Sequence, residues 1–114
     1  MRVAIVGSRE AGGFTVDGMI SHIRQNTSEL VSGGAAGIDT IAEQAARALD
    51  LPITIFAPDY GANGKLAPLI RNQKIVDYAD LVLAFWDHHS RGTAYTLNYC
   101  IQTHKPFRII GLHP

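Results

Sequence analysis

Glycines and reactive polar side chains gather at four places along the chain, and their types suit the binding of a phosphate. These places are Gly7-Ser8-Arg9, the stretch 32–39 (Ser-Gly-Gly-Ala-Ala-Gly-Ile-Asp), Asp59-Tyr60 and the stretch 86–93 (Trp-Asp-His-His-Ser-Arg-Gly-Thr). Glycine lets a backbone approach a ligand closely, and a helix that begins behind such a turn presents N–H groups with partial positive charge. We therefore expect a phosphate-bearing ligand, with arginine neutralising its charge.

Five short apolar runs alternate with helical patterns and must position these groups. The runs are Val3–Val6, Glu29–Ser32, Ile53–Phe56, Leu81–Trp86 and Phe107–Ile110, and apolar residues at helical spacing lie between them. Most runs are continuously apolar, which is typical of parallel strands covered on both faces. We predict an α/β, three-layer Rossmann-like sandwich with a five-stranded parallel sheet in the order 3-2-1-4-5. All four polar places then meet at the carboxyl edge, where open α/β sheets bind ligands.

Length and composition limit the classes of protein. A chain of 114 residues has room for a single domain, which we take to be 1–114. Ten basic residues balance ten acidic ones, and this neutral total disfavours nucleic acid as a partner. One cysteine excludes an internal disulfide, and no apolar run is long enough for a membrane span. We expect a cytoplasmic protein without a membrane partner.

Candidate ligand-binding residues come from these turns and from the third helical pattern. They are Gly7, Ser8, Arg9, Ser32, Gly33, Gly34, Gly37, Asp39, Arg71, Asn72, Trp86, Ser90, Arg91, Gly92 and Thr93. The glycines match neither G-x-G-x-x-G nor the P-loop, so neither a classical dinucleotide site nor a P-loop is predicted.

Each group also has a purely structural interpretation. The glycines of 33–37 would permit a tight turn, and Ser90 would cap a helix with its hydroxyl. Arg71, which we place at the opening of the third helix, would be a solvated surface charge. Trp86 would either cover the core or stack on a base.

Two further features carry weaker predictions. The stretch 57–64 reads as a mobile, irregular loop beside the site. His88 and His89 are neighbours without a third ligand at recognisable spacing, so we expect no metal and no cofactor.

The motif blocks, taken in order, resemble the SLOG superfamily, which joins DNA-processing protein A and the LOG phosphoribohydrolases. The blocks are Val3–Arg9, Val31–Thr40, Arg71-Asn72, Asp80 with Phe85–Asp87, and Ser90–Thr93, and they are most similar to the small stand-alone YspA-like branch. The resemblance implies a Rossmannoid core whose glycine loops bind nucleotides or nucleotide-derived ligands. It also implies a homo-oligomer.

One departure from that family bears on chemistry. The LOG enzymes carry a P-G-G-x-G-T-x-x-E motif, whereas here Gly92-Thr93 is followed by Ala-Tyr-Thr and no glutamate. Cleavage of an N-glycosidic bond needs a carboxylate, for which Asp39 and Asp87 are the candidates. Binding of a nucleotide is the leading hypothesis. A nucleoside-phosphate N-glycosidase, phosphoribohydrolase or transferase is the alternative, followed by a module associated with single-stranded DNA.

Overall fold

The sheet consists of five parallel strands in the order β3-β2-β1-β4-β5. The computed structural model describes residues 1–112 and gives the strands as β1 (Arg2–Gly7), β2 (Glu29–Ser32), β3 (Ile53–Ile55), β4 (Leu81–Trp86) and β5 (Phe107–Gly111). Val3 lies between Leu30 of β2 and Leu81 of β4, so β1 occupies the centre of the sheet. The predicted fold class and strand order are confirmed.

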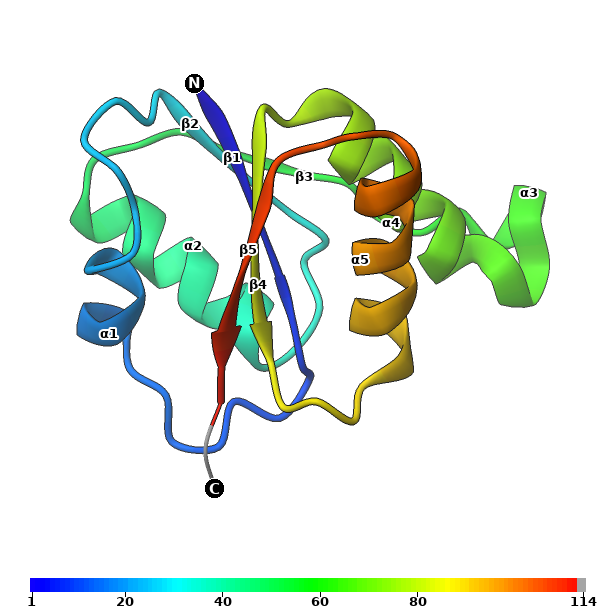
Figure 1. The fold of residues 1–114 in the computed structure, drawn as a ribbon, viewed down its shortest axis with the longest axis horizontal. Helices are drawn as coiled ribbons and strands as arrows, with labels where there is room; N and C mark the ends of the chain where they lie inside the picture. The colour runs from blue at the N-terminus through cyan, green and yellow to red at the C-terminus, as the bar shows by residue number, and fades with distance from the viewer. Residues whose placement is uncertain (113–114) are drawn as a thin grey trace.

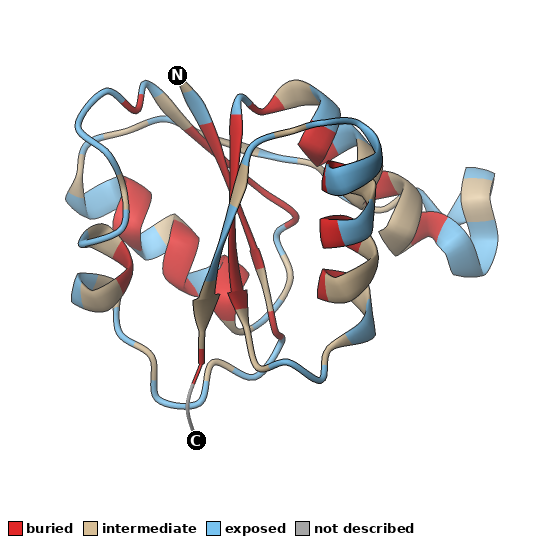
Figure 2. Ribbon diagram, viewed as in Figure 1, coloured by how far each residue is buried: buried red, intermediate tan, exposed pale blue. Residues whose placement is uncertain are grey.

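Helices cover both faces of this sheet (Figure 1). One face carries α1 (Val16–Ile20) and α2 (Ile38–Ala48), and the other carries α4 (Ala67–Tyr78) and α5 (Arg91–Gln102). Side chains alternate along β1, so Val3 and Ile5 join the core under α1 and α2, while Ala4 and Val6 join the core under α4 and α5. Figure 2 shows buried residues in the central strands and on the inward sides of the helices.

The stretch expected to be an irregular loop is partly helical. Tyr60–Asn63 forms the short helix α3, and a 3-10 turn, Gly64–Leu66, leads directly into α4. Asp59 Oδ1 accepts a hydrogen bond from Ala62 N at 3.0 Å, which caps α3 and explains why the prediction was wrong. Because α4 begins at Ala67, Arg71 lies in its second turn rather than at its opening.

Across the 112 described residues, the structure contains no helix with the length and apolar character needed to span a membrane.

Candidate phosphate-binding site

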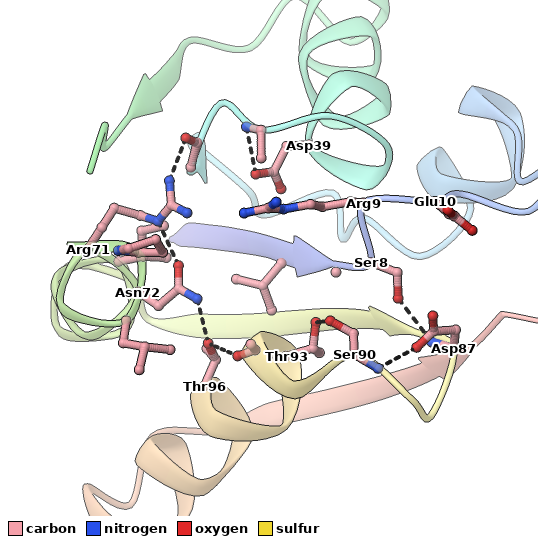
Figure 3. Close-up of a pocket in the computed structure, with 18 residues that line it drawn as sticks. Ser8, Arg9, Glu10, Asp39, Arg71, Asn72, Asp87, Ser90, Thr93 and Thr96 are labelled. Atoms are coloured by element: carbon pink, nitrogen blue, oxygen red, sulfur yellow. Dashed lines mark hydrogen bonds between the residues drawn. The ribbon is translucent and has the colours of Figure 1, made fainter. Parts of the chain in front are cut away.

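A cavity of about 380 Å³ opens at the carboxyl edge of the sheet (Figure 3). The turns after β1, β2 and β4 form its walls together with α4 and α5. Most of the predicted site residues line it: Gly7, Ser8, Arg9, Gly33, Asp39, Arg71, Asn72, Asp87, Ser90, Gly92 and Thr93. The parallel topology therefore brings together residues from four separate parts of the chain.

Five predicted residues do not line this cavity: Ser32, Gly34, Gly37, Trp86 and Arg91. The indole nitrogen of Trp86 donates to Ser90 O at 3.0 Å, and the ring lies 5.0 Å from that of His88, so Trp86 supports the β4–α5 turn. Arg91 is exposed at the start of α5, outside the cavity.

Some amides of the glycine loop 32–39 donate to other groups of the protein. Ile38 N donates to Ser8 O at 3.1 Å, and Ala35 N donates to Asp39 Oδ2 at 3.0 Å. Gly34 N lies 3.4 Å from Ser32 Oγ, a long hydrogen bond. These contacts favour the structural interpretation of the loop as a tight turn, and they correct the expectation that its helix presents a free N-terminus.

The first turn of α5, in contrast, is open. Among the described residues, none accepts a hydrogen bond from the amides of Arg91, Gly92 or Thr93. Ser90 occupies the N-cap position, yet its hydroxyl makes no cap bond and instead accepts from Thr93 Oγ1 at 3.3 Å. The predicted capping by Ser90 is wrong because Asp87 holds this turn: its Oδ1 accepts from the amides of His89 and Ser90, both at 2.8 Å.

Gly92 has no structural reason to be glycine. Its φ is not positive, and a Cβ placed there would meet nothing within 4 Å. Within a helix, glycine is disfavoured relative to alanine, by roughly 0.5–1 kcal/mol at mid-helix positions, because its backbone loses more freedom on folding. The open space above Gly92 is therefore what a closely approaching ligand would need.

Two arginines bring positive charge to this cavity. Arg9 is exposed and extends across it, as Figure 3 shows. Arg71 is only 9% exposed, so its interpretation as a solvated surface charge is wrong. Its Nη1 donates to Gly33 O at 2.7 Å and to Phe56 O at 3.3 Å, and its Nε donates to Asn72 Oδ1 at 2.7 Å. Within the described chain these bonds leave Nη2 for a ligand.

The two candidate carboxylates differ in environment. Hydrogen bonds from the amides of His89 and Ser90 lower the pKa of Asp87, so it remains ionised and serves as a turn acceptor. Burial raises the pKa of Asp39, which the Ala35 amide and the charge of Arg71 partly offset. Asp39 is thus the better proton acceptor of the two. Within residues 1–112, no three metal-ligating side chains of His, Cys, Asp or Glu converge.

The raised pKa of Asp39 predicts a pH dependence of stability. A carboxyl whose pKa is higher in the folded than in the unfolded state favours folding at low pH, and this contribution is lost as pH rises through the folded-state pKa. Asp39→Asn, whose side-chain oxygen still accepts from Ala35 N, should therefore gain stability relative to the wild type as pH rises from 3.5 to 7.5. Urea unfolding at both pH values measures this difference, with the exposed Asp50→Asn as control. A pH-independent difference would contradict it.

Sequence reasoning missed several lining residues, among them Glu10, Pro68, Leu69, Ile75 and Thr96. Thr96 was detectable, because it lies one helical turn beyond Thr93 on the same face of α5. Its hydroxyl is almost fully buried, donates to Gly92 O and accepts from Asn72 Nδ2.

Comparison with solved structures finds a similar fold in DNA processing protein A from Helicobacter pylori. The TM-score is 0.76 at 22% sequence identity, and the match covers 96% of this chain and 64% of that chain. The H. pylori structure describes a mode of binding single-stranded DNA. No curated protein matches the chain.

This match corrects the expectation that nucleic acid is disfavoured as a partner. The expectation rested on zero net charge, which describes the total and not its distribution. The cavity is lined by Arg9 and Arg71 and also by Glu10, Asp39 and Asp87, so the correction rests on the similar structure and not on a basic lining.

A family model also identifies the chain. The model described as DNA recombination-mediator protein A matches residues 1–76, which include β1, the glycine loop 32–39, β3, α3 and most of α4. The resemblance to the superfamily that contains DNA-processing protein A is thereby confirmed. The chain belongs to the DNA recombination-mediator protein A family.

Proposed function

We propose that the cavity at the carboxyl edge binds a backbone phosphate of single-stranded DNA. The observation that carries this proposal is the open first turn of α5, where free amides coincide with a glycine that neither packing nor backbone conformation requires. Arg9 and the Nη2 of Arg71 would supply the positive charge. Amides at a helix N-terminus together with arginine form a common phosphate-binding arrangement.

The choice of single-stranded DNA as the ligand rests on the relatives. Family membership and the similarity to the H. pylori protein both support it. We assign one phosphate to Arg71 and the amides of α5 and the next phosphate along the strand to Arg9, so the contact involves about two phosphates. The slope of log K against log salt should then be about −1.4, from roughly −0.7 per phosphate neutralised on a single strand.

A free nucleotide is the second candidate. The cavity of about 380 Å³ has the volume of a small-molecule site, and the chain carries no net positive charge to hold a long polyanion. The two candidates share the same phosphate contacts and differ in whether neighbouring nucleotides add affinity.

Fluorescence anisotropy with a labelled oligothymidylate tests the proposal. Gly92→Ala should weaken binding about tenfold, because a methyl group fills the space above the amides, while the midpoint of thermal unfolding stays equal or rises. Arg9→Gln should weaken binding to a similar extent and make the salt slope less negative by about 0.7.

Arg24→Gln is the matched control, since Arg24 is exposed and precedes β2, at the opposite edge of the sheet. Wild-type affinity in Gly92→Ala would refute the proposed site. Displacement of the oligonucleotide by thymidine monophosphate at equal concentration would favour the second candidate.

A further inference from the structure

A continuous line of hydrogen bonds runs beside the cavity. It joins the turn that contains Gly33 to the first turn of α5, which contains Gly92. Starting at Gly33 O, it runs through Arg71 (Nη1, 2.7 Å) and from Arg71 Nε to Asn72 Oδ1 (2.7 Å). It continues from Asn72 Nδ2 to Thr96 Oγ1 (2.9 Å) and ends with Thr96 Oγ1 donating to Gly92 O at 2.9 Å. Figure 3 shows this line passing from α4 to α5. We call these five residues the relay.

The chemistry of the groups fixes the direction of every bond in the relay. Arginine Nε is only a donor, so the Asn72 oxygen must face it and the Asn72 NH₂ group must face Thr96. The Thr96 hydroxyl therefore accepts from Asn72, and its single hydrogen is free to bond Gly92 O. The Asn72 amide cannot flip without breaking its bonds to both Arg71 and Thr96.

Two of the side chains in the relay are buried, which makes their hydrogen bonds costly to lose. Arg71 is 9% exposed and Thr96 is 1% exposed, so water cannot readily replace a partner of either side chain. The bond from Thr96 to the carbonyl four residues earlier is common for threonine in helices. The donation from Asn72 is the unusual element, because it ties this helical turn to a different helix.

We propose that Asn72 and Thr96 are positioning residues that set the distance between the open amides of α5 and the guanidinium of Arg71. This inference rests on the proposed function, since both groups at the ends of that distance are assigned to the phosphate. Neither positioning residue needs to touch the ligand. The relay holds Gly92 on one side and Arg71 on the other, so a single phosphate meets both at fixed spacing.

The test compares Thr96→Val with Thr96→Ser. Valine has nearly the shape of threonine, but it leaves Asn72 Nδ2 without its acceptor and removes the side-chain hydrogen bond to Gly92 O. Serine retains the hydroxyl. We expect Thr96→Val to raise the Kd for an oligothymidylate about tenfold and Thr96→Ser to stay within about twofold of the wild type.

Amide NMR spectra of the ligand-free variants provide a readout that does not depend on binding. The Gly33 and Gly34 amide resonances should move in Thr96→Val and stay in place in Thr96→Ser. Thr103→Val is the matched control: Thr103, at the C-cap of the same helix, donates from Oγ1 to Tyr99 O at 2.8 Å but takes no hydrogen bond from α4. It should leave the Gly33 and Gly34 resonances and the affinity unchanged.

The outcomes separate the two proposals. Shifts confined to the surroundings of residue 96 overturn the relay, even where the wild type binds the oligonucleotide. Shifts at Gly33 with unchanged affinity in Thr96→Val overturn the positioning role alone. A wild type that binds neither oligothymidylate nor thymidine monophosphate overturns the proposed function and, with it, the positioning role.

Discussion

Replacement of Gly37 by alanine should remove a large part of the stability of the fold. Gly37 has φ 72° and ψ −120°, a conformation that residues with a side chain rarely adopt. A Cβ there would lie 2.1 Å from Arg9 O and 2.7 Å from Ser8 O, both rigid backbone atoms. Backbone strain and overpacking together should lower the free energy of unfolding by about 4 kcal/mol, which corresponds to roughly 16 °C in the midpoint of thermal unfolding.

Gly64→Ala separates the two causes, because Gly64 also has positive φ but faces open space. It should lose only about 1 kcal/mol, from backbone strain. Calorimetry or circular dichroism of both variants gives the comparison. Equal losses at positions 37 and 64 would show that the contact with Arg9 and Ser8 contributes nothing.

Arg71→Met should produce the second largest effect, on both stability and binding. The substitution keeps an apolar chain of similar length but removes the donors to Gly33 O, Phe56 O and Asn72 Oδ1. Leaving these acceptors unpaired in a buried site should lower the free energy of unfolding by about 3 kcal/mol. The pKa of Asp39 should also rise further, since the charge of Arg71 lowers it in the wild type.

Lys74→Met is the matched control, because it removes an exposed positive charge from the same helix. Urea unfolding and oligonucleotide titration of the two variants test the prediction. If Arg71→Met were as stable as Lys74→Met, the hydrogen bonds of Arg71 would be dispensable for folding.

The sequence was sufficient to predict the sheet, because the pattern of its strands has a single physical reading. Residues 3–6 of β1 and all of β4 are apolar, which is typical of strands covered on both faces. The parallel order then places all strand ends at one edge, which is why the cavity residues were predicted from four separate segments. The partly helical stretch after β3 was missed because the cap by Asp59 depends on one local hydrogen bond.

The roles of individual site residues were harder to predict, since they depend on which partner is closest in space. Ser90 has the sequence context of a helix cap, but its hydroxyl makes no cap bond. Instead, Asp87 accepts from the amides of His89 and Ser90, and the amides of the first turn of α5 have no acceptor among the described residues. Arg71 reads as a surface charge in its own helix, and only the carbonyls of Gly33 and Phe56 make its burial favourable. Such choices among competing donors and acceptors lie beyond any pattern within a single segment.

The central place of β1 has a consequence for the order of events during synthesis. β1 pairs along its length with β4, and the Arg2–Asp80 hydrogen bond joins positions 78 apart. A ribosome must therefore release more than two-thirds of the described chain before the middle of the sheet closes, which makes folding slow relative to chains with local contacts. The cavity lies across this β1–β4 junction, so it forms only when the sheet closes. A ligand held there should stabilise the domain against global unfolding, not just the loops it touches.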